Sequence, residues 1–91
     1  MIFENVPVDP DTRILHHKEI MIDSLPVLIQ AWAWEGIAAE SAIFRADDVR
    51  GFSDEDLFQK VVDNYGVGSD QRHTITRDSD GYTFVNFNFE H

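Results

Sequence analysis

Apolar and polar positions along this chain follow mainly a short period, which predicts five β-strands. Residues 19–23 place three apolar side chains between two acidic ones, which indicates a half-buried strand. Residues 27–35 are apolar on both sides, as expected of a central strand. Residues 38–46 are strand-like despite their alanines, which favour strands less. Two further strands are predicted at residues 71–77 and 82–89.

A longer period at residues 54–65 predicts one amphipathic helix. Ser53 is a good N-cap, and the three acidic residues after it fill the first turn, where the helix dipole favours negative charge. Gly66 is expected to end the helix. The apolar stripe recurs at helical spacing and consists of Leu57, Phe58, Val61, Val62 and Tyr65.

The connections between these segments predict the fold class. Glu35-Gly36 is expected to turn the chain between two strands, and residues 78–81, Asp-Ser-Asp-Gly, to close a final hairpin. The order along the chain is therefore β-β-β-α-β-β. We expect an α+β fold: a single, mostly antiparallel five-stranded sheet with the one helix packed on one face.

The start of the chain reads differently from the rest. Residues 1–13 contain Pro7 and Pro10 beside two aspartates, which predicts an extended N-terminal arm. Three apolar side chains could anchor this arm to the body: Ile2, Phe3 and Val6. With a length of 91 residues, we expect residues 1–91 to form a single domain.

Alternate residues of a strand point to opposite faces of the sheet, so the pattern divides the side chains into two sets. The first set is purely apolar and is expected beneath the helix: Val27, Ile29, Ala31, Ala33, Val85, Phe87 and Phe89. The second set mixes rings with amides: Leu28, Gln30, Trp32, Trp34, Tyr82, Phe84, Asn86 and Asn88. The strand before the last hairpin adds Arg72, Thr74 and Thr76 to the second set. That face resembles neither a dry core nor an ordinary solvated surface.

Charge narrows the classes of partner. Seven Lys and Arg stand against seventeen Asp and Glu, which gives a formal net charge of −10. This disfavours direct binding to nucleic acid or to an anionic membrane, because phosphate contacts need a basic patch. Solubility, a basic protein partner and a cation all remain compatible with it. No apolar stretch is long enough to span a bilayer, and the chain has neither a signal-peptide pattern nor a cysteine, so we expect a cytoplasmic protein.

The polar residues give no motif of catalysis or metal binding. The densest acidic cluster comprises Asp47, Asp48, Asp54, Glu55 and Asp56. Helix capping accounts for the last three, which leaves Asp47 and Asp48 as a candidate acidic surface for a partner. Residues 78–81 begin like a calcium loop but lack its later ligands. The histidines, His16, His17 and His73, have no metal-ligand spacing, so we expect no metal and no cofactor.

Three functional hypotheses follow from the sequence. The first is a non-catalytic interaction protein of the inhibitor or immunity type, self-associating as a homodimer through the ring-and-amide face. That interface would use Gln30, Trp32, Trp34, Tyr82, Phe84, Asn86 and Asn88. The second is a small-molecule binder or small enzyme with a pocket on the same face. The third is an acidic mimic of nucleic acid. Tryptophans usually fill a core, and the amides sharing their face are what favours a platform or interface here.

Overall fold

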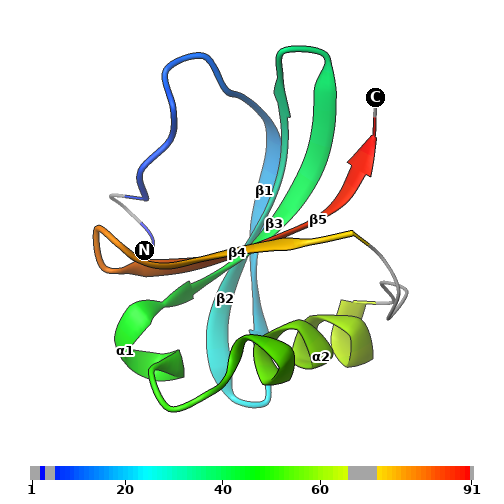
Figure 1. Ribbon diagram of the computed structural model, residues 1–91. Helices are drawn as coiled ribbons and strands as arrows, with labels where there is room; N and C mark the ends of the chain where they lie inside the picture. Colours follow the sequence, from blue (N-terminus) through cyan, green and yellow to red (C-terminus); the bar gives the residue numbers. More distant parts are fainter. Residues whose placement is uncertain (1–2, 4–5, 66–71, 91) are drawn as a thin grey trace.

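The computed structural model describes Phe3, residues 6–65 and residues 72–90, and it confirms the predicted fold class. All five strands belong to one antiparallel sheet with the order β1-β2-β3-β5-β4 (Figure 1). The strands are β1 (Arg13–Ile22), β2 (Leu25–Trp34), β3 (Ile37–Arg45), β4 (Thr74–Ser79) and β5 (Tyr82–Glu90). The helices are α1 (Ala46–Val49) and α2 (Asp54–Tyr65).

The helix α2 begins and ends at the predicted residues among those described, and it covers one face of the sheet. Ser53 Oγ accepts a hydrogen bond from the Asp56 backbone N–H at 3.1 Å, which confirms the N-cap. Leu57 and Val61 are fully buried against β2, β3 and β5. The predicted helix stop at Gly66 lies outside the described residues. The core beneath α2 contains Val27, Ile29, Ala42, Phe44, Val85 and Phe87.

Tight turns join the paired strands. Glu35-Gly36 and Asp80-Gly81 close two hairpins with positive φ at both residues, the geometry that best matches strand twist. Asp23 and Ser24, with φ of 48° and 66°, close the first hairpin in the same way. Leu25 and Pro26 pair with Ile22 and Met21 inside the sheet, so this connection consists of Asp23 and Ser24 alone.

Every strand differs from its predicted extent at one end or both; β4, for example, covers Thr74–Ser79 where residues 71–77 were expected, which reduces the last turn to Asp80 and Gly81. The first strand begins at Arg13, well before residue 19. The sequence pattern did not indicate its first residues, because β1 is an edge strand whose outer residues face water and show little apolar alternation. The third strand ends at Arg45, and Ala46 starts the short helix α1 instead of ending the strand. Val49 of α1 is fully buried in the core, so this turn of helix extends the core past the end of β3.

A bulge in β5 changes the predicted assignment of its last residues to the two faces. One extra residue lies on β5 between the pairs Ala38–Glu90 and Glu40–Phe87, and Asn88 has a φ of 55°. Asn88 therefore turns to the helix side, where its Nδ2 donates to Glu40 Oε1 at 2.9 Å. Phe89 turns to the other side and packs edge-on against Trp32, with ring centroids 6.3 Å apart. The prediction of Phe89 in the core and Asn88 opposite was wrong, because a bulge reverses the alternation.

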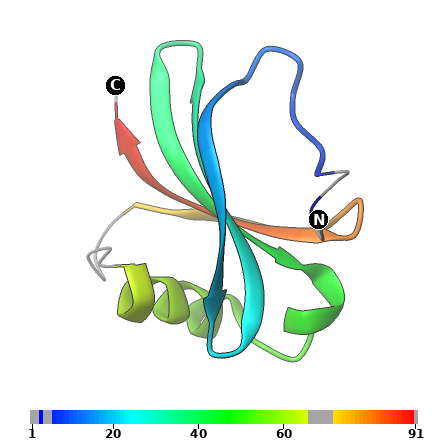
Figure 2. The ribbon, with the colours of Figure 1, turned by 180° about the vertical axis from the view of Figure 1, so that it is seen from behind.

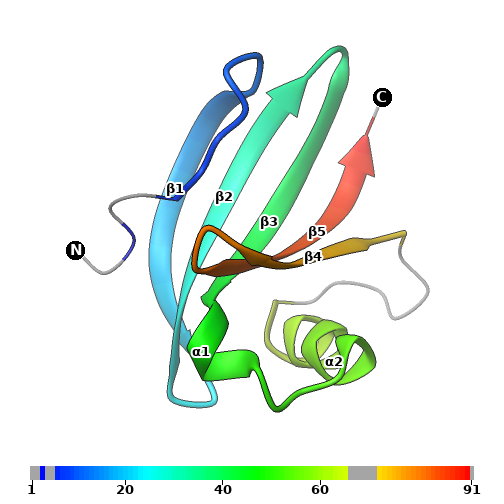
Figure 3. The same ribbon diagram turned by 60° about the vertical axis from the view of Figure 1, so that its left-hand side comes forward.

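The N-terminal arm and the helices lie on opposite faces of the sheet. Residues 6–12 leave the start of β1 and pass over the face away from α1 and α2 (Figures 1 and 3). The view from behind shows the same separation (Figure 2). Within the described part of the chain, neither helix is long and apolar enough to cross a membrane. The sheet therefore separates a core beneath the helices from a second set of contacts beneath the arm.

Candidate functional site

The arm covers part of the face that we expected to be open. Phe3 is only 4% exposed and packs against Leu28 and Ile43, with its ring centroid 5.9 Å from that of Tyr82. Val6 and Phe84 complete this small cluster. Phe3 and Val6 thus anchor the arm to the body, as expected, and the arm covers part of the ring-and-amide face. The four large rings, Trp32, Trp34, Tyr82 and Phe84, are all half-buried.

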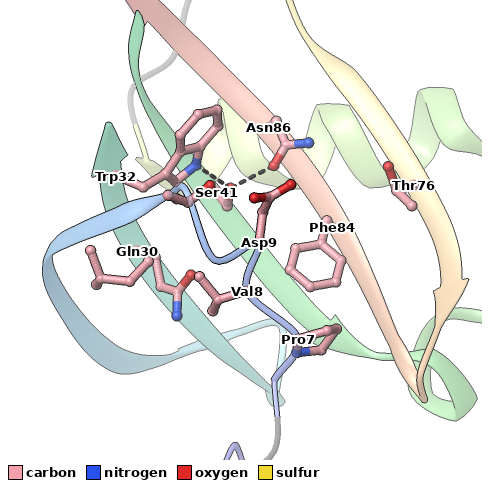
Figure 4. A pocket seen from close by; sticks show the side chains of 11 residues that line it. Pro7, Val8, Asp9, Gln30, Trp32, Ser41, Thr76, Phe84 and Asn86 are labelled. Carbon is pink, nitrogen blue, oxygen red and sulfur yellow. Dashed lines mark hydrogen bonds between the residues drawn. The ribbon is translucent and has the colours of Figure 1, made fainter. Parts of the chain in front are cut away.

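Beside this cluster, the arm and the sheet enclose a pocket of about 240 Å³ (Figure 4). Pro7, Val8 and Asp9 cover it from the arm side. Thr12 and Ile14 contribute where the arm joins β1. The sheet side combines two rings with polar groups and consists of Gln30, Trp32, Ser41, Thr76, Phe84 and Asn86. The pocket therefore gathers four of the predicted site residues: Gln30, Trp32, Phe84 and Asn86.

A directed chain of hydrogen bonds fixes the polar side of the pocket. Trp32 Nε1 donates to Ser41 Oγ at 2.7 Å, and Ser41 Oγ donates to Asn86 Oδ1 at 2.5 Å. Asn86 Nδ2 then donates to Thr74 Oγ1 at 3.1 Å. An indole N–H can only donate, so Ser41 accepts from Trp32, its hydroxyl hydrogen goes on to Asn86, and the Asn86 amide has one orientation. Trp32 and Asn86 are thus held in place before any ligand arrives.

Ser41 is the member of this chain that the sequence analysis missed. It is 3% exposed and pairs across the sheet with Gln30 on one side and Asn86 on the other. Its strand was predicted, but a single serine between Glu40 and Ala42 carries no signal of its own. The register of β2, β3 and β5 would have revealed it, since it places Gln30, Ser41 and Asn86 in one row.

Gln30 is the amide of the pocket lining that has no hydrogen-bond partner in the described part of the chain. It is 8% exposed, and its amide forms no hydrogen bond with any residue that the structure describes. The side chain lines the pocket beside Val8 (Figure 4). Its amide keeps contact with solvent, because Arg77 Nη1 is the one fully buried side-chain polar atom without a hydrogen bond among the described residues. The Gln30 amide is therefore a group that a bound molecule or an ordered water would satisfy.

The remaining predicted site residues lie outside the pocket. Trp34 is at the end of β2, and Tyr82 lies beneath Phe3. Asn88 is on the helix face beside Glu40, as described above. Glu40 also interacts with Tyr65. Burial is the largest cause that raises the pKa of Tyr65, and the negative charge of Glu40 and a hydrogen bond with Glu40 raise this pKa further. The seven predicted residues thus divide between the pocket, the arm contact, the strand end and the opposite face.

The acidic residues before α2 are largely paired. The Asp48 carboxylate accepts two hydrogen bonds from Arg45, at 2.8 and 3.2 Å, and only 19% of its side chain is exposed. Asp47 pairs with Arg50 at 2.9 Å, but 86% of its side chain is exposed. Arg50 also contacts Asp78 at 3.3 Å. The ion pair with Arg45 therefore accounts for the acidic side chain of Asp48. Of the two residues proposed to contact a partner, Asp47 is the more accessible.

The histidines and hydroxyls lie in surroundings that give no catalytic arrangement. His16 and His17 are on the exposed edge strand β1, and His73 stacks on Phe58 with ring centroids 3.6 Å apart. Within the described residues there is no group of three side chains able to hold a metal ion. Ser41 donates its hydroxyl hydrogen to an amide oxygen, which cannot act as a general base.

Comparisons of the chain with known protein families, with curated proteins and with solved structures found no match.

Proposed function

We propose that this protein binds a small organic molecule, without catalysis, in the pocket between the N-terminal arm and the sheet. The observation that carries this proposal is the Gln30 amide, which is 8% exposed, faces the pocket and has no partner among the described residues. Because this amide is open to solvent and not committed to a hydrogen bond within the described chain, a ligand in the pocket can replace water on it. A ligand with one donor and one acceptor would satisfy both ends of this amide.

The size and lining of the pocket support a ligand of about one ring. Ordinary ligand pockets measure about 300–1,000 Å³, and an apolar cavity of about 150 Å³ already holds benzene. At about 240 Å³, this pocket lies near the lower limit of that range. Trp32 and Phe84 offer ring surface, and Gln30 offers hydrogen bonds that fix orientation. Such a mixture of apolar walls and a few polar groups is typical of small-molecule sites.

Protein binding is a second proposal, and it uses different parts of the surface. The net charge of −10 and the exposed Asp47 favour a basic partner and disfavour nucleic acid. Homodimerisation through the ring-and-amide face has less support than the sequence suggested, because the arm lies on that face. Mimicry of nucleic acid is weakened because arginines pair with Asp47 and Asp48. Cytoplasmic localisation is likewise our proposal, supported by the absence of cysteine.

Trp32 provides a direct reporter for the first proposal. Trp34→Phe leaves Trp32 as the one tryptophan, so its indole N–H gives a single assigned NMR signal. We expect small neutral aromatic compounds (benzamide, phenol and indole at millimolar concentration) to shift this signal, with benzamide binding most tightly because it satisfies both ends of Gln30. Gln30→Leu conserves approximate size but removes the amide, and should weaken benzamide severalfold while changing phenol less.

The control is Gln59→Leu on the exposed side of α2, where the amide donates to Asp63 away from the pocket. This variant should bind benzamide as the parent does. If none of the three compounds shifts the Trp32 signal, the protein has no ligand pocket at this place. If Gln30→Leu binds benzamide as tightly as the parent, the amide is not the recognition group and the proposal fails.

A further inference from the structure

The charge of the pocket bears on which ligands it can accept. Of the described residues that line it, Asp9 alone carries a charge, and no Lys, Arg or His is among them. Asp9 Oδ1 accepts the Asp11 N–H at 2.9 Å, and the Asp9 carbonyl accepts the Thr12 N–H at 2.9 Å. This local turn fixes the backbone of Asp9 at the pocket, which its side chain lines together with Ser41 and Asn86 (Figure 4).

The hydrogen-bonding groups of the pocket, like its negative charge, bear on the choice of ligand. Trp32 N–H and the Ser41 hydroxyl already donate within the chain of hydrogen bonds described above. Among the pocket groups with spare capacity, the Gln30 amide and the Thr12 and Thr76 hydroxyls can both accept and donate, whereas Asp9 Oδ2 can only accept. A ligand that places an N–H donor at Asp9 therefore fits better than one that places an acceptor there.

The rings and the whole chain add to this preference. The face of an indole or phenyl ring attracts a cation placed over it, and Trp32 and Phe84 both line the pocket. The net charge of −10 raises the local concentration of cations and lowers that of anions around the protein. No described lining residue could neutralise an anionic ligand at this site.

We propose that the pocket selects small organic cations, namely flat apolar rings bearing a protonated amine or amidine group that contacts Asp9 and Gln30. This inference rests on the proposed function, because it names the chemical class of the ligand for the same pocket. Asp9 would act as the charge-recognition residue, and Gln30 as the neutral hydrogen-bonding partner.

Three nearly isosteric probes test this selection: benzamidine, benzamide and benzoate, which are cationic, neutral and anionic. Their affinities are measured from the Trp32 indole signal in the Trp34→Phe background. We expect benzamidine to bind about fivefold or more tightly than benzamide at low salt, and benzoate to bind most weakly. The advantage of benzamidine over benzamide should shrink as salt is added, because the pair is near the surface.

Asp9→Asn and Asp11→Asn form a matched pair of variants. Each removes one negative charge from the arm, but Asp11 is not part of the pocket lining. Asn at position 9 keeps a side-chain oxygen that can accept the backbone hydrogen bond of the turn. Asp9→Asn should abolish the preference for benzamidine over benzamide. Asp11→Asn should retain the preference.

The outcomes separate this inference from the function on which it rests. If benzamide and benzamidine bind equally to the parent, the selection of cations is overturned while ligand binding stands. If neither shifts the Trp32 signal, ligand binding itself fails. If the preference survives in Asp9→Asn, or falls equally in both variants, Asp9 is not the recognition residue and the inference is wrong.

Discussion

Asn88 has a positive φ of 55° at the point where β5 carries one extra residue against β3. L side chains avoid this region, but Asn adopts it more readily than most residues. Its amide then donates to Glu40 at 2.9 Å on the helix side. The same bulge brings Phe89 to Trp32 on the pocket side. One backbone conformation therefore changes the surroundings of two side chains.

Substitution of Asn88 can separate backbone conformation from hydrogen bonding. Asn88→Gly loses the bond to Glu40 but tolerates the positive φ, whereas Asn88→Ala loses both. We therefore expect the alanine variant to have a free energy of unfolding about 1 kcal/mol lower than the glycine variant. Urea denaturation measures the difference. Equal stability of the two variants would show that the bulge does not require this conformation.

The Ser53 cap gives a second prediction for a single side chain. Its hydroxyl oxygen accepts the Asp56 N–H at 3.1 Å at the start of α2. Ser53→Ala leaves that N–H to solvent and should lower the free energy of unfolding by about 1 kcal/mol. Ser53→Asn is the control, because Asn is an equally good N-cap and should leave the urea midpoint nearly unchanged. A parent-like midpoint for Ser53→Ala would contradict the role of the cap.

The elements differ in how much of their stability depends on contacts elsewhere in the chain. The helix α2 carries its own cap, acidic first turn and apolar stripe, and the structure places it at the predicted residues. The strand β1 carries little apolar alternation, and its extent follows from pairing with β2 along ten residues. Local sequence thus defines α2, whereas a neighbouring strand defines β1.

Leu57 tests the packing of α2 on the sheet. It is fully buried in the core cluster. Leu57→Ala should lower the free energy of unfolding by about 2–5 kcal/mol, because the removed methyl groups leave a cavity that the sheet cannot fill. The control is Leu15→Ala on β1, where the side chain is 51% exposed and the cost should be within about 0.5 kcal/mol. An unchanged urea midpoint for Leu57→Ala would place the core elsewhere.

At the scale of the whole molecule, the arm takes the place of a second layer on the sheet. The helices cover one face, and Phe3 with residues 6–12 lies on the other. A sheet with one uncovered aromatic face would be expected to associate with other chains. Here the arm supplies part of that cover from within the same chain and creates the pocket at its edge.

This role of the arm predicts that its anchor controls self-association. Phe3→Ala removes the ring that packs on Leu28, Ile43 and Tyr82, and it should loosen the arm and uncover these side chains. We expect faster hydrogen exchange in residues 6–12 and, by light scattering, a larger average mass than the parent at high micromolar concentration. The cost in global stability should stay below the about 3–5 kcal/mol typical of Phe→Ala in a core, because the arm can detach by itself.

Val8→Ala is the matched control, since Val8 lies on the same arm with 43% of its surface exposed. It should change neither exchange nor mass. If Phe3→Ala keeps the mass and the exchange rates of the parent, the arm does not prevent self-association through this face of the sheet. If the parent is a dimer and Phe3→Ala is a monomer, the arm belongs to the dimer interface instead.

The sequence by itself determined the features that depend on neighbours in the chain. These are the helix at 54–65 with its cap, the order of strands and helix along the chain, and two of the hairpin turns. They also include a second sheet face that carries Trp32, Gln30 and Asn86. Each follows from local periodicity, capping or turn chemistry, which act over a few residues. The sequence therefore predicted the fold class and most of the side chains on the sheet side of the pocket.

Only the tertiary structure decided what those side chains do. The β5 bulge moved Asn88 and Phe89 to faces opposite to those predicted, and strand register brought Ser41 between Trp32 and Asn86. The path of the arm decided that the rings are covered and that Gln30 lines a pocket instead of an open face. These outcomes depend on contacts between residues far apart in the chain. Alternation within one strand cannot encode them, because a single extra residue reverses it and a distant segment can cover it.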